Sequence, residues 1–388
     1  MVIACRAVLV LAVSGAAVFA QSVPAPADSQ PAPPAAPAGW TRVDLATLAP
    51  PLIDEETARK MFAGVRSGKR QKWDPISLQA LKENVNLAFK WEEHEGGRVT
   101  MRTNNLGFRR DSDISPLKTS LRVFVAGDSH TDGLVNNAES FVTLLENRLN
   151  AQGDDKRYEC INAGVGGAGP HVYLGMLRKA LALQPDLFVA MLYVGNDFMD
   201  ALYVQDHFSG RKGTRPPYDE YQKPLDDAQK KWKETSLIGN SFNQCYRYKL
   251  IPDEEPLALA EVIATFDSMA KICADNHIQF VVGIIPTKPE VDEDDKERSA
   301  QIMADLNLTD TDMQANVRLH EGFAHTMRGH GFTVVDPTEA MKAGTAVYYW
   351  LRDHHLNVEG NRMVAEQLFP VVQARLENLA MPARQEEK

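Results

Sequence analysis

The sequence predicts an α/β fold in which three layers, helix, sheet and helix, are built on a central parallel sheet of about five strands. From residue 121 onward, short apolar runs alternate with longer amphipathic stretches, the order expected of a parallel sheet with helices on both faces. The run DLFVAMLYV, residues 186–194, is apolar almost throughout, as in a strand buried on both faces. The chain has 388 residues, enough for one main domain with additions.

The elements of the main domain follow in order along the chain. The strand-like runs are residues 121–126, 158–163, 186–194, 278–285 and 332–336. The helical patterns between and after them are residues 138–150, 171–183, 257–276, 312–329 and 358–378.

Residues 40–120 are expected to form an N-terminal extension that packs on the main domain. Their pattern predicts one helix from Ile76 to Phe89 and an extended pair from Glu92 to Thr103, which turns at Gly96-Gly97.

The main domain is expected to span residues 121–380, with insertions at 198–256 and 288–311 and a tail at 381–388. The first insertion is rich in aromatic and basic residues, and the second is acidic. Both follow strand ends, the side on which open α/β sheets bind ligands.

The first 39 residues predict export. Residues 1–20 carry one basic residue, then an apolar stretch that ends in small residues, the pattern of a cleaved signal peptide. Residues 21–39 are mostly Pro, Ala and Ser, which predicts an extended linker. We therefore expect a secreted or periplasmic protein with no stable membrane insertion, and Cys5 is poorly placed to be a lipid-anchor cysteine.

Composition excludes several function classes. The formal net charge of −10 makes nucleic acid a poor partner. Cys160, Cys245 and Cys273 remain after signal cleavage without C-x-x-C spacing, so at most one disulfide can form and neither a metal nor a redox motif is indicated.

A serine follows the first predicted strand, in Gly127-Asp128-Ser129. At the carboxyl end of a strand, a sharp turn can present its hydroxyl to a ligand. The alternative is a helix N-cap, for which Asp and Ser are both favoured, and taken alone this segment favours the cap.

The segment Asp353-His354-His355-Leu356-Asn357 precedes the last predicted helix, with Asn357 as its expected N-cap. An Asp two residues before a His can fix the imidazole tautomer, as the acid of a catalytic triad does. Asp and two His also suit zinc, but no further ligand cluster supports a metal.

Two further segments follow strands. Residues 162–169, NAGVGGAG, predict an anion cradle of backbone N–H groups. They also match the dinucleotide fingerprint at Gly164, Gly166 and Gly169, but Asp186 has the required distance and begins the next strand, whereas Asp197 ends that strand and is too far away. The segment Gly195-Asn196-Asp197 presents an amide at a strand end or forms a simple turn.

Other motifs indicate surface. The histidines of His320-Glu321 and His325 are five residues apart, not the four of the metalloprotease helix, and predict a solvated helix face. The acidic run from Glu290 to Glu297 lacks the glycine of a calcium loop and is likewise expected to be solvated. There is no G-x-S-x-G.

Together these segments resemble the SGNH/GDSL hydrolase family, whose fold is flavodoxin-like. Four blocks stand in the family's order: Gly127-Asp128-Ser129, the glycine of residues 162–167, Gly195-Asn196-Asp197, and Asp353-x-His355. The segment 103–109, TNNLGFR, is similar to one that precedes the serine block in an exported bacterial branch. The resemblance covers about residues 100–380.

The resemblance implies a role for each matched residue. Ser129 would be the nucleophile, His355 its general base and Asp353 the acid that orients the histidine. The N–H groups of Ser129 and Gly167, with the Asn196 amide, would form the oxyanion hole. Two points stay open: whether Gly166 or Gly167 donates, and the shorter Asp-x-His spacing than the D-x-x-H of many relatives.

His130 and Asp128 are candidates for the pocket wall. His130 would line the acyl pocket, stabilise charge or face solvent as an ordinary helix residue.

The implied function is hydrolysis of carboxylic esters, with short-chain acetyl esters and carbohydrate or other small-molecule substrates favoured. No cofactor and no metal are expected. The alternatives are a polysaccharide O-acetyltransferase, a lysophospholipase or thioesterase, and a glycan-binding module without catalysis. Oligomeric state is not predicted.

Overall fold

A five-stranded parallel sheet forms the centre of the main domain, in the order β6-β5-β7-β8-β9. The computed structural model describes residues 42–152, 157–211, 217–233, 235–292 and 296–381, so the predicted signal peptide, linker and most of the tail lie outside the described residues. The strands are β5 (Leu121–Gly127), β6 (Tyr158–Asn162), β7 (Leu187–Tyr193), β8 (Gln279–Ile285) and β9 (Thr333–Val335). All five predicted strands are present, which confirms the fold class.

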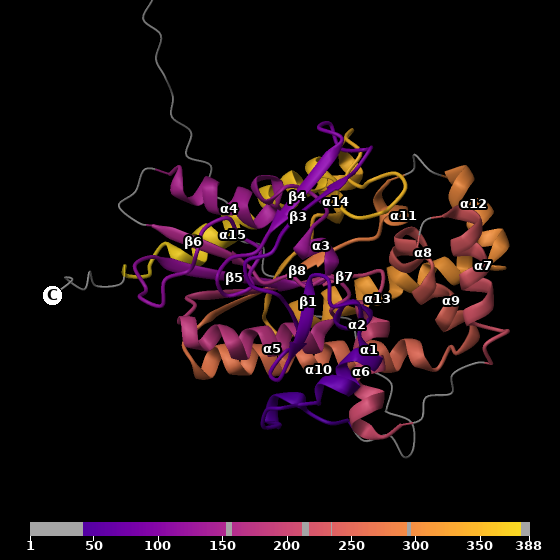
Figure 1. The fold of residues 1–388 in the computed structure, drawn as a ribbon, viewed down its shortest axis with the longest axis horizontal. Coiled ribbons are helices and arrows are strands. Elements are labelled where there is room, and N and C mark those ends of the chain that lie inside the picture. Colours follow the sequence, from indigo (N-terminus) through magenta and orange to yellow (C-terminus); the bar gives the residue numbers. More distant parts are fainter. Residues whose placement is uncertain (1–41, 153–156, 212–216, 234, 293–295, 382–388) are drawn as a thin grey trace, which may run out of the picture. The chain divides into compact units, whose positions relative to one another are not determined.

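Helices cover both faces of this sheet (Figure 1). On β5, Phe124 and Ala126 pack into one core while Val123 and Val125 pack into the other, because successive side chains of a strand point to opposite faces. The first core is closed by α5 (Pro170–Ala180), α10 (Glu254–Asp275) and α13 (Asp310–Gly329). The second is closed by α4 (Phe141–Asn150) and α15 (Val358–Leu376).

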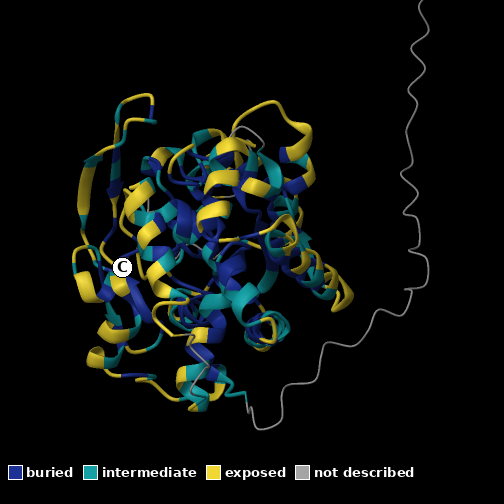
Figure 2. Ribbon diagram, turned by 90° about the vertical axis from the view of Figure 1, so that its right-hand side faces the viewer, coloured by how far each residue is buried: buried dark blue, intermediate teal, exposed yellow. Residues whose placement is uncertain are grey.

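The strands β5 and β7 are buried along their whole length, as the apolar run at 186–194 predicted. In Figure 2 the centre of the molecule is dark blue and the outlying loops and helix faces are yellow. The described part of the chain contains no helix long and apolar enough to cross a membrane. Cys160, Cys245 and Cys273 are buried and free, so none of these three forms a disulfide.

The predicted helix from Ile76 to Phe89 is wrong. The chain forms β1 (Gln71–Asp74), which pairs antiparallel with β2 (Leu78–Leu81), and then enters β3 (Asn86–Lys90). Asp74 starts the turn, because its carboxylate accepts hydrogen bonds from the N–H groups of the two residues after Pro75. An Asp-Pro turn of this kind is a hairpin signal, and the pairing that it allows overrides the helix-like spacing of the apolar residues.

The predicted turn at Gly96-Gly97 is confirmed, but the predicted first strand is misplaced, because β3 ends at Lys90 and residues 92–97 lie in the connection. The hairpin consists of β3 and β4 (Arg98–Arg102). Gly97 has φ +62°, a backbone conformation that glycine adopts without strain. Before these hairpins the extension forms η1 (Leu45–Thr47), α1 (Glu55–Met61) and α2 (Ala63–Ser67).

The predicted insertions are largely helical. The first holds α6 (Asp197–Ser209), α7 (Gln222–Trp232), α8 (Thr235–Ser241) and α9 (Asn243–Leu250), and the second holds α11 (Lys288–Val291) and α12 (Lys296–Asp305). The remaining short elements are α3 (Ser129–Asp132), η2 (Asn137–Glu139), η3 (Leu181–Leu183) and α14 (Thr338–Ala343). In Figure 1, α7, α8, α9 and α12 gather on one side of the molecule.

Candidate active site

Ser129 is the first residue of α3, directly after β5. The N-cap of this helix is Asp128, whose Oδ1 accepts a hydrogen bond of 2.8 Å from the N–H of His130. The capping function therefore belongs to Asp128 and not to Ser129. Gly127 permits the tight turn, since a Cβ there would lie 2.0 Å from Thr131 Oγ1. The Ser129 hydroxyl donates to Asp128 Oδ2 at 3.2 Å.

Asp353 and His355 form a hydrogen-bonded pair between Oδ1 and Nδ1. Burial disfavours the imidazolium, but the adjacent carboxylate outweighs burial and raises the pKa of His355. Burial likewise opposes ionisation of Asp353, yet His355 keeps the pKa of that carboxyl below its ordinary value. In the described part of the chain Nε2 of His355 makes no hydrogen bond, which leaves it available as a base.

The loop that carries this pair is held on both sides. The side-chain N–H of Asn240, in α8, donates to the Asp353 carbonyl at 3.1 Å, and the N–H of Trp350 donates to the His355 carbonyl at 2.9 Å. Asn357 caps α15, as the sequence predicted, by accepting from the N–H of Gly360. The backbone of Asp353 and His355 is therefore fixed by contacts on both sides.

His354 turns away from this pair. It has φ +64°, in the left-handed region that few non-glycine residues adopt, and its Nδ1 lies 2.7 Å from Ser241 Oγ. The two histidines of the segment thus have different partners. Among the described residues no group of three or more His, Cys, Asp or Glu has the arrangement of a metal site.

The glycine loop between β6 and α5 packs directly on α3. A Cβ on Gly164 would lie 2.3 Å from the backbone nitrogen of Asp132, and a Cβ on Gly166 would lie 3.9 Å from Ser129 Cβ. Gly167 has φ +68°. Within the described chain neither the Gly166 nor the Gly167 N–H has an acceptor, so both are free to donate to a ligand beside Ser129.

Asp186, the acid at the distance that the dinucleotide fingerprint requires, bonds other residues. Asp186 directly precedes β7 and accepts from Lys118 Nζ and from the N–H of Arg122, both at 2.7 Å. It therefore lies at the amino end of the strands, opposite the glycine loop. At the sheet edge that carries the glycines, the acid that follows β7 is Asp197, which is too far along the chain for the fingerprint and is bonded to Tyr173 and Tyr193.

Asn196 follows β7 and is the N-cap residue of α6. Its Oδ1 is buried and has no hydrogen-bond partner in the described chain. An oxyanion is an acceptor, so it can bond the side-chain N–H of Asn196 and not this oxygen. The neighbouring Asp197 has a structural role, since its Oδ2 accepts from the N–H of Tyr193 and the hydroxyl of Tyr173, both at 2.8 Å.

His130 is fully buried, so the solvent-facing interpretation is wrong. Its ring stacks on Tyr193 with a centroid distance of 3.8 Å and lies 4.6 Å from the ring of His355. Burial, reinforced by the charge on His355, lowers the pKa of His130 well below its ordinary value. His130 is thus a neutral ring packed beside the ring of His355. Burial also raises the pKa of Asp128 to about 6.

The structure brings most of the predicted site residues together at the carboxyl edge of the sheet. Asp353 bonds His355, and the ring of His355 contacts His130, the residue after Ser129. One predicted contact is missing: the Ser129 hydroxyl bonds Asp128 and not His355.

Several residues at the site were not predicted. The guanidinium of Arg109, in the segment 103–109, donates to the carbonyls of Gly133 and Val135 and so holds the end of α3. Arg70 forms an ion pair with Asp132 of the same helix. The motif resemblance at 103–109 was a signal for Arg109, whereas no sequence pattern pointed to Arg70.

His320 is buried, which makes the prediction of a solvated helix face wrong for this residue. Its Nδ1 lies 2.6 Å from Glu290 and its Nε2 lies 3.0 Å from Asp336. The prediction that the acidic run is solvated is therefore also wrong at Glu290, which pairs with His320. His325 is exposed, as expected.

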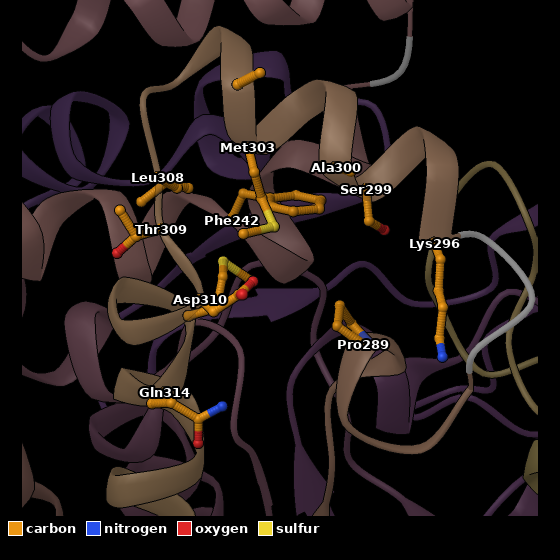
Figure 3. A pocket seen from close by; sticks show the side chains of 12 residues that line it. Phe242, Pro289, Lys296, Ser299, Ala300, Met303, Leu308, Thr309, Asp310 and Gln314 are labelled. Carbon is orange, nitrogen blue, oxygen red and sulfur yellow. The ribbon is translucent and has the colours of Figure 1, made fainter.

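A cavity of about 690 Å³ opens beside α12, between Met303, Phe242, Pro289 and Asp310 (Figure 3). Its lining includes none of the predicted catalytic or oxyanion residues. It is therefore separate from the groups that surround Ser129.

A parallel α/β/α sheet that carries a strand-end serine, a glycine loop and an acid–histidine loop at one edge has the architecture of an acyl hydrolase. The model of the GDSL-like Lipase/Acylhydrolase family matches residues 125–363. The chain belongs to this family and is a carboxylic ester hydrolase.

A search of curated proteins by sequence gave no match. Among solved structures, TesA is 15% identical, with 66% of this chain and 99% of that chain covered and a TM-score of 0.39. The acetyl xylan esterase AlAXEase is 17% identical, with 65% and 99% covered and a TM-score of 0.39. A catalytic mutant of Axe2, an acetylxylan esterase from Geobacillus stearothermophilus, is 13% identical, with 70% and 100% covered and a TM-score of 0.38.

Proposed function

We propose that the protein is an exported serine esterase that hydrolyses short-chain carboxylic esters, above all acetyl esters, carried by a carbohydrate or another small alcohol. Family membership establishes ester hydrolysis, and the proposal adds the catalytic groups, the compartment and the substrate. The observation that carries it is the Asp353–His355 pair, whose free Nε2 belongs to a ring in contact with the segment that bears Ser129.

In the proposed reaction Ser129 Oγ attacks the ester carbonyl carbon while Nε2 of His355 takes the hydroxyl proton, because a serine hydroxyl is a weak nucleophile without a base. The carbonyl oxygen becomes an oxyanion that accepts from the N–H groups of Ser129 and Gly167 and from the Asn196 amide. The bond to the alcohol breaks as His355 returns the proton to the departing oxygen. Water, activated by the same histidine, then cleaves the acyl-enzyme and releases the acid.

The Ser129 hydroxyl must leave Asp128 before it can meet the base. Rotation about the Cα–Cβ bond moves it between staggered positions, and the 3.2 Å hydrogen bond to Asp128 is not a short one. The resting serine is thus held by its neighbour, and a bound ester is expected to draw the hydroxyl toward His355.

The compartment and the alcohol rest on sequence features. The signal-like residues 1–20 and the Pro- and Ala-rich residues 21–39 support export. In the first insertion, Tyr203 and Tyr218 are exposed, and aromatic rings at a surface can stack on a sugar. Phe242, Tyr246 and Tyr248 are buried and belong to the core, so the aromatic richness of this insertion is mainly structural.

The short acyl chain is favoured by the surroundings of the serine. The bulky rings of Tyr193 and Tyr349 pack against His130, the residue next to Ser129. The 690 Å³ cavity, which would suit a long acyl chain, is lined by none of the proposed catalytic residues.

A panel of p-nitrophenyl esters from acetate to decanoate tests this proposal. We expect the highest kcat/KM on acetate, with loss of hydrolysis in Ser129→Ala and retention in Ser268→Ala, a serine of α10 remote from the site. A decanoate optimum would contradict the acyl preference, and full activity of Ser129→Ala would contradict the nucleophile. Addition of a polysaccharide acceptor tests transfer, because acyl transfer in excess of hydrolysis would make the protein an O-acetyltransferase.

A further inference from the structure

The β1–β2 hairpin of the N-terminal extension lies outside the family match at 125–363, yet it contacts the glycine loop. Nε2 of Gln71 donates to the Gly166 carbonyl at 2.7 Å, and Nε2 of Gln79 donates to the Gly167 carbonyl at 2.8 Å. Gln71 pairs with Leu81 in the hairpin register, two residues from Gln79. The two glutamines therefore lie on one face of the hairpin, turned toward the loop.

These two hydrogen bonds act on different peptide groups. The Gly166 carbonyl and the Gly167 N–H belong to one planar unit, in which the two groups point in opposite directions. A donor that fixes this carbonyl also fixes the direction of the N–H. It polarises the amide as well, which strengthens the hydrogen bond that the N–H can donate.

We propose that Gln71 is a positioning residue of the oxyanion hole, which aims the Gly167 N–H at the substrate oxygen through the Gly166 carbonyl. This inference rests on the proposed function. It also selects Gly167 over Gly166 as the donor, since the Gly166 N–H belongs to the preceding peptide, which Gln71 does not contact.

The Gln71 amide is held in place although one of its polar atoms lacks a hydrogen bond. Its Oε1 is buried without a hydrogen-bond partner in the described chain, an unfavourable state that a merely structural residue would avoid. Gly64 provides the space, because a Cβ at that position would lie 1.6 Å from Gln71 Oε1. The absence of a side chain at Gly64 therefore makes room for the Gln71 amide.

Gln79 is the matched control. It lies in the same hairpin and bonds the same loop, but its carbonyl belongs to the peptide whose N–H is that of Ala168. That N–H already donates to the Val165 carbonyl at 3.0 Å, so it is no oxyanion donor. The Arg70–Asp132 ion pair and the remaining glutamine keep the hairpin attached when either glutamine is replaced.

The experiment compares Gln71→Met with Gln79→Met, since Met keeps the side-chain length and removes the donor. An oxyanion donor contributes a factor of about 10² to 10³ in rate, and we expect a misdirected donor to lower the rate about tenfold. Gln71→Met should therefore lower kcat on p-nitrophenyl acetate about tenfold and slow phosphonylation of Ser129, with KM nearly unchanged, because the contact acts in the transition state. Gln79→Met should keep kcat within about twofold.

A second pair of variants tests the position of the Gln71 side chain without replacing Gln71 itself. Gly64→Ala should displace the Gln71 amide and lower kcat in the same direction, whereas Gly329→Ala, where an added Cβ meets nothing within 4 Å, should not. Equal kcat in wild type and Gln71→Met, equal losses in Gln71→Met and Gln79→Met, or a change confined to KM would overturn the role of Gln71. Those results leave wild-type activity and its loss in Ser129→Ala intact, whereas an inactive wild type would overturn the proposed function and this role together.

Discussion

The described chain holds several histidine–carboxylate pairs with little exposure, and two of them, at His320 and His355, differ in how many ring nitrogens are occupied. His320 has a carboxylate on each side, Glu290 at Nδ1 and Asp336 at Nε2. His355 has Asp353 at Nδ1 and no hydrogen bond from Nε2 in the described chain. A histidine with both nitrogens bonded holds structure, whereas one with an oriented ring and a free nitrogen can move a proton.

The charges of the two groups follow from this difference. At His320 two carboxylates outweigh burial and raise its pKa to about 9, and Asp336 is lowered to a pKa of about 2. At His355 a single carboxylate outweighs burial and raises the pKa, while the uncharged His130 ring packs beside it. The first group is therefore a fixed ion pair, and the second has the free ring nitrogen that the proposed base requires.

The largest expected difference is in activity. His355→Gln should lower kcat about 10⁴-fold or more, as loss of a triad member does, whereas His320→Gln should keep kcat within about threefold because it touches no reacting group. Steady-state hydrolysis of p-nitrophenyl acetate at 25 °C measures both. Comparable activity in the two variants would remove the distinction between the histidines.

Asn196 should give the next largest effect. Asn196→Ala removes one proposed oxyanion donor and is expected to lower kcat about 10²- to 10³-fold with little change in KM. The comparison is Asn240→Ala, which removes a hydrogen bond to the Asp353 carbonyl but no oxyanion donor. We expect it to lower kcat less than Asn196→Ala does. If Asn196→Ala kept wild-type kcat, the side-chain N–H of Asn196 would have no part in the reaction.

His320→Gln should lower the free energy of unfolding and not the activity. The substitution removes the cation between Glu290 and Asp336 and leaves Asp336 only the more distant Arg328, at 3.7 Å. This is expected to destabilise the fold by about 3 kcal/mol. His330→Gln is the control, since its 2.9 Å pair with Asp267 is exposed and should be worth at most about 1 kcal/mol. Urea unfolding at pH 6 measures the difference.

The same His320 variant predicts a pH window. A histidine whose pKa is raised on folding stabilises fully below its unfolded value of 6.5, and this contribution is lost as pH rises through about 9. The gap between wild type and His320→Gln should therefore be full at pH 6 and close above pH 9. A gap that is constant with pH would show that His320 is not charged in the fold.

The smallest effect concerns the pH dependence of catalysis. The base must be neutral, and the pKa of His355 is raised, so activity should fall on the acid side with a midpoint above the ordinary 6.5. Asp353→Asn should shift this midpoint to lower pH in the residual activity. A kcat/KM profile from pH 5 to 9 measures it, and a wild-type midpoint below 6.5 would contradict the Asp353–His355 coupling.

The comparison also shows what the sequence can reveal. Runs such as 186–194 predicted the parallel sheet because a strand buried on both faces needs apolar residues at every position. The blocks at Ser129, Gly167, Asn196 and Asp353 could be found because each follows a strand or precedes a helix, and strand ends of a parallel sheet meet at one edge.

The rest depends on tertiary partners that no local pattern encodes. His320 was taken for a surface residue, since Glu290 and Asp336 meet it only in the folded chain. His130 was left open for the same reason, because Tyr193 and His355 come from other segments. The helix expected at 76–89 failed because the Asp74 turn and the pairing with β1 outweigh helical spacing.

Labelling with a fluorophosphonate probe tests the central claim most directly, because the probe reacts with a serine that a neighbouring base activates. We expect one adduct per chain by intact mass, mapped by peptide sequencing to Ser129, lost in Ser129→Ala and strongly slowed in His355→Gln but not in His320→Gln. Equal labelling of Ser129→Ala, or ester hydrolysis by a wild-type protein that takes up no probe, would contradict the account.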